Sequence, residues 1–247
     1  MSQERKNIFV GEIATHYDAD STGVFDPAVV TTTVDFLAEL AGDGRALEFA
    51  IGTGRIGLPL SERGVPVSGI ELSSDMAAQL KKKPGSEAID VAIGDMTSTR
   101  VDGTFRLVYL VFNTIGNLLS QDEQVDCFCN AAAHLEPGGC FVIEVIVPPL
   151  RRLPPGESSL VFTLTPQRVG YDEIDVAQQM GVSHHIWFRE DGPKKFATPW
   201  RLVWPAELDL MARIAGMRLR ERWQDWDRSP FTGESMKHVS VWEKTRD

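Results

Sequence analysis

The sequence contains no long hydrophobic run, which argues against a protein built on membrane-spanning helices. No apolar run approaches the roughly 18 to 20 residues that such a helix needs. The first six residues are polar, and no apolar segment follows them, whereas a secretory signal would place one there. We therefore expect no membrane partner and a cytoplasmic location.

Cysteines and basic residues are also scarce. The chain of 247 residues holds three cysteines. Cys127 and Cys129 are expected on different faces of one helix and Cys140 in an apolar strand, so we interpret them as buried thiols. With 25 basic and 35 acidic residues, the formal net charge is −10. This balance disfavours nucleic acid as a partner, because phosphate backbones are bound by clustered Lys and Arg.

Glycines are concentrated in the segment from Leu47 to Gly57. An apolar run gives way to a turn containing Gly52 and Gly54, and a helical pattern begins at about Arg55. Glycines let a ligand approach the backbone, and the first amides of a helix point at that ligand. The segment therefore predicts a nucleotide-type site. The spacing Gly52-x-Gly54-x-x-Gly57 also fits the dinucleotide fingerprint, so the loop alone leaves the nucleotide open.

Strands and helices alternate over residues 46–147. The apolar patterns predict strands at 46–50, 65–72, 89–93, 105–112 and 140–147. The helices predicted by the periodicity lie at 8–18, 26–41, 55–63, 73–82 and 121–135. Such alternation is typical of an α/β fold with a parallel sheet, helices on both faces and ligands beyond the carboxyl ends of the strands.

The alternation stops at a proline-rich segment after residue 147. Strand patterns at 160–165, 174–180, 183–189 and 196–204 predict a small inserted antiparallel β module beside the ligand cleft. A helix at 206–215 and strands at 218–223 and 238–243 follow. We therefore expect three parts: N-terminal helices (1–45) that cover the site, a core (46–150 and 205–247), and an inserted module (151–204) for substrate binding or homo-oligomer formation.

Two cofactors explain the glycine loop and the acid Glu71, which lies 17 residues after Gly54 where ribose hydroxyls are bound. One is NAD(P), and the other is S-adenosylmethionine (SAM). The motif Glu48-x-Ala50-x-Gly52-x-Gly54 resembles motif I of class I SAM-dependent methyltransferases, with Ala50 in place of the commoner glycine. Gly69-Ile70-Glu71-Leu72-Ser73 with Met76, and Gly94-Asp95-Met96, resemble the family's ribose and adenine motifs. We favour SAM, and an NAD(P)-binding protein remains the alternative.

The resemblance implies a Rossmann-like, seven-stranded, mostly parallel sheet, whose antiparallel end is formed by the tail of the chain. It also implies a set of cofactor contacts. Glu48 would face the cationic amino end of SAM, Glu71 the ribose, and Asp95 the adenine amino group. The expected cofactor-binding residues are Tyr17, Glu48, Ala50, Gly52, Gly54, Arg55, Glu71, Leu72, Met76, Gly94, Asp95, Met96, Phe112 and Asn113.

The acceptor should meet the methyl group at the end of the fourth strand. The segment from Phe112 to Asn117 contains no acid, and no cluster with metal-ligand spacing lies near it, so we expect no metal and disfavour metal-assisted O-methylation. An Asn/Asp-Pro-Pro-aromatic motif, the signature of enzymes that methylate nucleobase or glutamine amides, is also missing. The chain is similar to small-molecule N-methyltransferases of the aminosugar and antibiotic-tailoring kind. An O-methyltransferase, a protein methyltransferase and a non-catalytic SAM-binding protein remain alternatives.

Catalytic and substrate-binding candidates lie on the N-terminal helix and the insert. In the similar enzymes a tyrosine closes over the methyl group, and Tyr17 matches it. His184 and His185 alternate faces on a strand, so only one can look into the cleft and take the acceptor's proton. Substrate contacts are expected from Phe9, Asn113, Asn117, Trp200 and Arg201. Arg201 would fix an anionic group of the acceptor.

Overall fold

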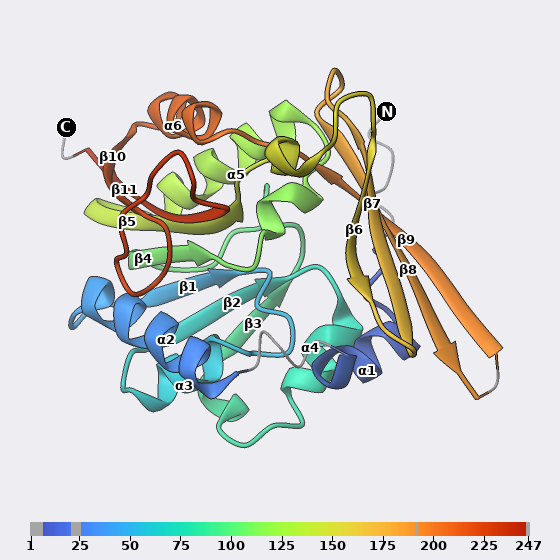
Figure 1. Cartoon of the computed structure of the whole chain (residues 1–247). Coiled ribbons are helices and arrows are strands. Elements are labelled where there is room, and N and C mark those ends of the chain that lie inside the picture. Colours follow the sequence, from blue (N-terminus) through green and yellow to red (C-terminus); the bar gives the residue numbers. More distant parts are fainter. Residues whose placement is uncertain (1–6, 21–25, 191, 246–247) are drawn as a thin grey trace.

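Two sheets organise the chain. The computed structural model describes residues 7–20, 26–190 and 192–245 (Figure 1). Parallel strands of the larger sheet are β1 (Ala46–Phe49), β2 (Val67–Glu71), β3 (Asp90–Ile93), β4 (Phe105–Leu110) and β5 (Leu135–Ile146). β11 (Lys237–Lys244) and β10 (Met217–Trp223) extend it antiparallel, giving the order β10-β11-β5-β4-β1-β2-β3. The predicted fold class, a seven-stranded mostly parallel sheet, is confirmed.

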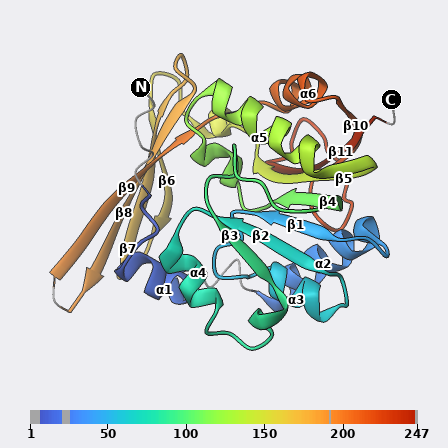
Figure 2. The same cartoon turned by 180° about the vertical axis from the view of Figure 1, so that it is seen from behind.

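Helices cover both faces of this sheet, as Figures 1 and 2 show. Those on one side are α2 (Pro27–Ala41), α3 (Gly57–Glu62) and α4 (Ser74–Leu80). Those on the other side are α5 (Gln121–His134) and α6 (Pro205–Ile214). Two clusters of buried residues fill the two interfaces, one around Phe128, Phe141 and Trp242 and one around Phe36 and Tyr109.

Short polar signals set several helix boundaries. Asp26 caps α2 by accepting a hydrogen bond from the backbone N–H of Ala28, and Pro27 occupies the first turn. Ser120 and Glu123 form a reciprocal capping box at the start of α5. The hydroxyl of Ser73 accepts from the backbone N–H of Met76 and starts α4 directly after β2. The caps at Ser73 and Ser120 fix where the loops at the carboxyl ends of β2 and β4 end.

The inserted residues form the second, four-stranded antiparallel sheet. Its strands are β6 (Ser159–Leu164), β7 (Arg168–Asp175), β8 (Met180–Arg189) and β9 (Gly192–Arg201). The separate antiparallel sheet confirms that part of the predicted fold. The expected strand at 174–180 is wrong, because residues 176–179 form the turn between β7 and β8. Asp175 accepts from the N–H of Gln178, and Gln179 has a φ of +54°.

Three other expected boundaries are corrected. β5 begins at Leu135 rather than at 140, because it pairs with β4 from Phe105↔Leu135 onward. β9 runs from 192 to 201 rather than from 196 to 204. The N-terminal helix α1 (Glu12–Asp20) begins four residues later than expected, and Gly11, with a φ of +57°, precedes it.

The second sheet and α1 stand at the carboxyl ends of β1 to β4, as Figures 1 and 2 show. The N–H of Gly11 donates to Asp75 Oδ2 of α4 at 2.7 Å, and the Ser73 hydroxyl donates to the carbonyl of Phe9. At the C-terminal end of the second sheet, in β9, the buried Arg201 guanidinium donates to Gln124 of α5 and to Glu207 of α6. The carboxyl ends of the parallel strands therefore face two elements, α1 and the second sheet, that a plain α/β domain would lack.

Candidate active site

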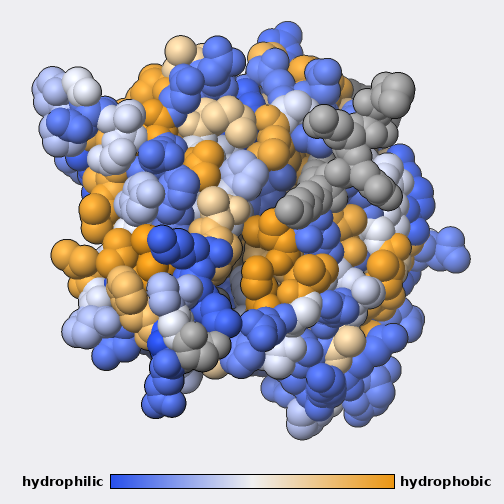
Figure 3. Space-filling view, turned by 90° about the vertical axis from the view of Figure 1, so that its right-hand side faces the viewer, coloured by the Kyte–Doolittle hydropathy of each residue, from blue (hydrophilic) through white to orange (hydrophobic). Residues whose placement is uncertain are grey.

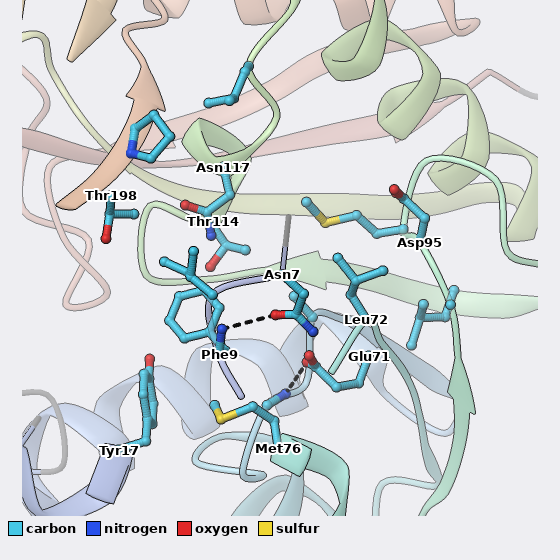
Figure 4. Close-up of a pocket in the computed structure, with 18 residues that line it drawn as sticks. Asn7, Phe9, Tyr17, Glu71, Leu72, Met76, Asp95, Thr114, Asn117 and Thr198 are labelled. Atoms are coloured by element: carbon cyan, nitrogen blue, oxygen red, sulfur yellow. Dashed lines mark hydrogen bonds between the residues drawn. The ribbon is translucent and has the colours of Figure 1, made fainter. Parts of the chain in front are cut away.

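A small cavity of about 150 Å³ lies beyond the carboxyl ends of β1, β2 and β3 (Figure 4). The ends of β1 to β4 and the loops after them supply its wall, together with residues of α1 and the segment before it and with part of β9. Of the residues expected to bind the cofactor, the cavity is lined by Tyr17, Ala50, Gly52, Glu71, Leu72, Met76, Gly94, Asp95 and Met96. The three sequence motifs, far apart along the chain, therefore converge on one site.

Backbone amides hold the carboxylate of Glu71. Oε2 accepts from the N–H of Gly52 and Oε1 from the N–H of Ser73, each at 2.8 Å. Burial raises the pKa of Glu71, while the hydrogen bonds from Ser73 and Gly52 act to lower it. A carboxylate oxygen can accept more than one hydrogen bond, so Glu71 can still accept from a ligand's hydroxyl groups. Such an arrangement suits a ribose.

Asp95 lies at the end of the cavity away from Thr114, Asn117 and Thr198, as Figure 4 shows. Its Oδ1 accepts from the backbone N–H and the hydroxyl of Thr97, both at 2.8 Å, which fixes the carboxylate at the start of the loop. Apolar side chains of Ile70, Leu72, Met76 and Met96 also line the cavity. An apolar lining with an acid at one end suits an aromatic base that bears an amino group.

The turn after β1 has left-handed backbone at three positions. The φ angles are +52° at Ala50, +58° at Gly52 and +80° at Gly54. Glycine adopts this conformation freely, whereas a residue with a Cβ is uncommon there. A Cβ on Gly52 would lie 3.4 Å from Met76 Cε, in ordinary contact with the cavity wall. Ala50 therefore has a backbone conformation that favours glycine.

Glu48 does not line either cavity, which corrects the expectation that its carboxylate faces the cofactor. It is buried in β1, where it accepts from the Tyr109 hydroxyl at 3.0 Å and from the backbone N–H of Gly57. Burial raises the pKa of Glu48 to about 8 despite these hydrogen bonds and the nearby Arg55. A Cβ on Gly57 would lie 2.7 Å from Glu48 Oε2, so the third glycine of the motif makes room for this carboxyl group.

Gly54 and Arg55 also line neither cavity. The Arg55 guanidinium lies 5.5 Å from the centre of the Phe112 ring. Phe112 and Asn113 line a second, larger cavity rather than the small one, and both have a φ of +58°. Asn113 Oδ1 accepts from the N–H of Ile146, so its side chain holds the end of β4 to β5.

The larger cavity measures about 960 Å³ and lies between α1 and the second sheet. The two cavities share lining residues, which we call the neck: Ile8, Phe9, Tyr17, Thr114, Asn117 and Thr198. The rings of Phe9 and Tyr17 meet edge to face at 6.0 Å. Burial raises the pKa of the Tyr17 hydroxyl, so it keeps its proton. The neck is therefore where a group in the larger cavity would meet a cofactor in the smaller one.

One face of the second sheet forms the wall of the larger cavity. Strand alternation and register place Asp172, Ser183 and Thr198 in one cross-strand row. His185 and Phe196 form the next row, and Arg168, Trp187 and Lys194 the row after it. We call this surface, which also includes Arg189 and Trp200, the cavity face. All of these side chains line the cavity.

The two histidines of the insert do face opposite sides. His184 lines neither cavity, and its Nε2 lies 2.8 Å from Glu173 Oε2 while its ring stacks on Tyr171. This position corrects the expectation that His184 reaches the acceptor. His185 lines the larger cavity and stacks on Phe196 with ring centres 4.5 Å apart.

His185 is poorly suited to accept a proton. A guanidinium only donates, so the 2.9 Å contact between Arg168 Nη2 and His185 Nδ1 uses the lone pair of that nitrogen. Burial and the charge of Arg168 lower the pKa of His185 to about 4, so its ring is neutral at pH 7 with the proton on Nε2. His185 can donate a hydrogen bond to a ligand, which corrects the expected role as a base.

Arg201 is likewise corrected as a substrate contact. It lines neither cavity, and its guanidinium donates to Gln124 Oε1 at 2.7 Å and to Glu207 Oε1 at 2.6 Å. Trp200, its neighbour on the other face of β9, does line the larger cavity, and it packs in a small cluster with Ile174 and Leu202. Phe9 and Asn117 lie in the neck.

Several lining residues were not anticipated from the sequence. They include Asn7, Ile8, Glu12, Ile13, His16, Thr114, Leu119, Arg168, Asp172, Ser183, Arg189, Lys194, Lys195, Phe196, Thr198 and Pro199. Asp172 bears most directly on the chemistry of the site, because it is the carboxylate in the cross-strand row that contains Thr198 of the neck. Its Oδ1 accepts from the Ser183 hydroxyl at 2.6 Å. No local motif marks it, since its place depends on the pairing of β7 with β8.

Neither a metal site nor a membrane-spanning helix is found among the described residues. Over residues 7–20, 26–190 and 192–245, no three His, Cys, Asp or Glu side chains gather as a metal site would require. Within the same residues, every helix is too short or too polar to cross a membrane.

Comparison with known proteins agrees with this geometry. A family profile described as a methyltransferase domain matches residues 46–139. The structure of the CcbJ methyltransferase from Streptomyces caelestis is 34% identical, with a TM-score of 0.81, and the match covers 90% of this chain and 95% of that one. The cypemycin N-terminal methyltransferase of Streptomyces sp is 26% identical over 214 residues, which is 82% of this chain and 84% of the relative.

A third relative is the dTDP-3-amino-3,4,6-trideoxy-alpha-D-glucopyranose N,N-dimethyltransferase of Streptomyces venezuelae. It is 29% identical over 140 residues, or 52% of this chain and 58% of the relative. The fold, the motif-lined cavity and these similarities define the class: the chain belongs to the SAM-dependent methyltransferases. It is an enzyme of that class, and SAM is its cofactor.

Proposed function

We propose that this enzyme transfers a methyl group from SAM to an amine nitrogen of a small molecule held in the larger cavity. The single observation that carries the proposal is the neck, where the motif-lined cavity meets a roomy second cavity. SAM supplies a methyl group already activated by the sulfonium charge. The protein therefore has to align the acceptor, and alignment alone can lower a barrier by about 7 to 11 kcal/mol.

The small cavity fits SAM by the chemistry of its donors. Glu71, oriented by two backbone amides, would accept from the ribose hydroxyls, and Asp95 would accept from the adenine amino group. Leu72, Met76 and Met96 would pack on the adenine. The left-handed turn at Gly52 would let the backbone approach the amino-acid part of SAM.

Tyr17 would close the neck over the reacting groups. Its ring lines both cavities, and its hydroxyl keeps its proton, so it can donate a hydrogen bond but does not act as a base. Its oxygen can also accept a hydrogen bond from an N–H of the amine, which orients the amine and leaves its lone pair free for attack. If turnover at saturating SAM is the same in Tyr17→Phe, the hydroxyl has no part in this alignment and only the ring matters.

Nitrogen is favoured as the attacked atom for two reasons. Asp172 lies in the same cross-strand row as Thr198 of the neck, and a carboxylate there can bind an ammonium group and take its proton before attack. The second reason is that two of the relatives carry names that describe methylation of nitrogen, on a peptide N-terminus and on an amino sugar.

Mass spectrometry tests the proposal. Purified enzyme is incubated with SAM and matched pairs of small molecules that differ only in an amine or a hydroxyl group. We expect a gain of one methyl on the amines alone. Methylation of the hydroxyl partners would move the assignment to O-methylation. In a parallel incubation with labelled SAM and cell protein, label in the protein fraction without methylation of any small molecule would move it to a protein acceptor.

We further propose that residues 151–204 form a module of their own that binds substrate and joins two copies of the enzyme in the cytoplasm. The outer face of the second sheet supports self-association, because Val161, Leu164 and Phe188 are exposed there. Light scattering on the purified chain tests this. A monomeric mass at micromolar concentration would contradict it.

A further inference from the structure

A strained turn follows β4. Phe112 and Asn113 both have a φ of +58°, in the left-handed region, where a residue with a Cβ is uncommon and a bulky one is an outlier. Such backbone persists only where its surroundings determine it, and it is concentrated at functional sites. Packing of the Phe112 ring does not account for the turn, because the residue is 44% exposed. The hydrogen bonds of the turn therefore show what holds it.

Two residues of the neck follow this turn directly. Thr114 and Asn117 are the first and last residues of the short 3₁₀ helix η3 (Thr114–Asn117), so their side chains lie on one face of it. The Thr114 hydroxyl donates to the carbonyl of Val111, the residue before the turn, at 2.8 Å. Figure 4 shows both side chains at the same end of the small cavity. The turn therefore sets where these two polar groups stand.

Apolar groups surround the neck. Ile8, Phe9 and the ring of Tyr17 line it together with the two polar side chains. In Figure 3, which faces the side where the second sheet and α1 lie, hydrophobic residues gather near the centre and hydrophilic ones surround them. A hydrogen bond is stronger in apolar surroundings than in water, so a small displacement of Thr114 or Asn117 has a large effect on a bound group.

Glu144 of β5 holds both strained residues. β4 pairs with β5 as far as Leu110↔Ile143, so the N–H of Phe112 lies beyond the last pair of the ladder. Oε2 of Glu144 accepts from this N–H at 3.0 Å, and the carbonyl of Glu144 accepts from the N–H of Asn113 at the same distance. A side chain therefore takes over where the pairing of the strands ends.

An acid is unexpected at this position of the sheet. The neighbours of Glu144 on β5 are buried apolar residues, and its own side chain is 14% exposed. A charge in such a place costs free energy unless it is paired. Lys237 Nζ donates to Oε1 at 3.4 Å and is itself 2.8 Å from Asp225 Oδ1. The ion pair therefore leaves Oε2 for a charge-assisted hydrogen bond with Phe112.

The other end of the neck segment is held separately. The buried Gln124 of α5 donates from Nε2 to the carbonyls of Ile115 and Leu118, at 3.1 and 3.2 Å. Arg201 of β9 donates to Oε1 of the same Gln124. Because this end is fixed by α5, the placement of η3 depends on the turn at its start, and that turn depends on Glu144.

We propose that Glu144 is a positioning residue for methyl transfer. By binding the N–H of Phe112, it holds the turn that places Thr114 and Asn117 around the point where the methyl group of SAM meets the acceptor. Glu144 lines neither cavity, so it acts through the turn. The inference rests on the proposed function for the place of the methyl group, and it does not depend on which acceptor is methylated.

Calorimetry with two SAM analogues tests this role without an acceptor. S-adenosylhomocysteine lacks the methyl group, and sinefungin carries an amino group in its place, so the ratio of their dissociation constants reports on the neck. Glu144→Gln and Glu144→Met both remove the charge, but only the Gln side chain can still accept from the N–H of Phe112. In Glu144→Met we expect sinefungin to bind about 10-fold more weakly and S-adenosylhomocysteine within about 2-fold of wild type. Glu144→Gln should restore most of the affinity for sinefungin.

Hydrogen exchange shows whether the effect passes through the turn. The amides of residues 111–118 should exchange at least about 10-fold faster in Glu144→Met than in wild type or Glu144→Gln. The matched control is Glu136→Met, which removes an acid of β5 that lies 3.7 Å from Arg106, and it should behave as wild type in both measurements. Thermal unfolding confirms that each variant is folded. If Glu144→Met does not fold, wild type alone decides: its Phe112 amide should exchange at least about 100-fold more slowly than in an unstructured peptide.

The outcomes separate this role from a merely structural one. Equal weakening of both analogues in Glu144→Met would mean general damage to the cofactor cavity and would refute the proposal. An unchanged ratio refutes it whether or not exchange is faster, and so does a changed ratio without faster exchange at 111–118. A loss in Glu144→Gln as large as in Glu144→Met, or the same loss in the control, would assign the effect to charge and refute it as well. Methylation of hydroxyl groups would overturn the proposed function and leave this inference standing.

Discussion

The two cavities of this enzyme are built in different ways. The small one is made where strands end: the turn after β1 and the acids after β2 and β3 present backbone amides and carboxylates in short, contiguous motifs. The large one is made from every second residue of three antiparallel strands, opposed by α1. The small cavity is therefore specified by short local motifs, whereas the lining of the large one depends on strand register.

The largest expected effect concerns Glu48, which the motif assigns to the cofactor and the structure assigns to the core. Its pKa of about 8 exceeds its ordinary value of 4.5, so between these pH values the folded chain keeps a proton that the unfolded chain releases. The free energy of unfolding should therefore fall as pH rises from 5 to 8, by up to about 4 kcal/mol from this group.

Urea unfolding of wild type and Glu48→Gln at several pH values measures this share. The difference between the two curves isolates Glu48, because the other titrating groups are common to both. We expect the free energy of unfolding of the variant to rise steadily relative to that of wild type as the pH approaches 8. At pH 6 the variant should bind S-adenosylhomocysteine as wild type does. If the two curves of stability against pH are parallel and the variant binds S-adenosylhomocysteine much more weakly, Glu48 acts in cofactor binding and not in the core.

The next effect is on cofactor affinity. Glu71→Ala removes the carboxylate that is held by two amides and that would meet the ribose, so the dissociation constant for S-adenosylhomocysteine should rise about 100-fold, at about 1.5 to 3 kcal/mol for each hydrogen bond to a charged group. Calorimetry gives this constant. Asp172→Ala, a carboxylate lost from the other cavity, should leave it unchanged. Similar losses in both variants would mean that the two cavities are not independent.

A smaller effect is expected on the acceptor side. Asp172→Asn should lower kcat/KM for an amine acceptor by roughly 10- to 100-fold at pH 7, since the amide cannot take the ammonium proton. The deficit should shrink at higher pH, because more of the amine is then already neutral. Initial rates from pH 7 to pH 10 check this. A deficit that is the same at every pH would show that Asp172 only shapes the cavity.

The smallest effect concerns Ala50. Ala50→Gly places glycine at a φ of +52°, and we expect a gain in the free energy of unfolding of about 0.5 kcal/mol, the strain relieved less the entropy cost of glycine. Ala88→Gly is the matched control at an exposed position without positive φ, and it should lose a similar amount. Urea unfolding measures both. A loss at position 50 would show that the alanine methyl group contributes packing that outweighs its backbone strain.

The contrast between the cavities also explains how far the sequence could be read. Glycine spacing, strand-end acids and helix caps such as Ser120 act within a few residues, so the main sheet and the Glu71 and Asp95 positions could be predicted. Glu48 could not, because its partner Tyr109 lies on another strand and the fit of Gly57 against it appears only in three dimensions. Asp172 depends on a register that no local pattern records. Arg201 has its partners on α5 and α6, so its charge gave no sign of its burial.

The alternation of the cavity face bears on how such an enzyme can diversify. On β7 to β9, the hydrogen bonds that define the second sheet are made by backbone atoms, while side chains at alternate positions line the larger cavity. Substitutions at Arg168, Asp172, Phe196 or Lys194 therefore change the lining of that cavity without altering the strand pairing or the cofactor motifs. If the acceptor binds there as proposed, an enzyme with this scaffold can acquire new substrates by single substitutions, each leaving the methyl donor and its binding loop untouched.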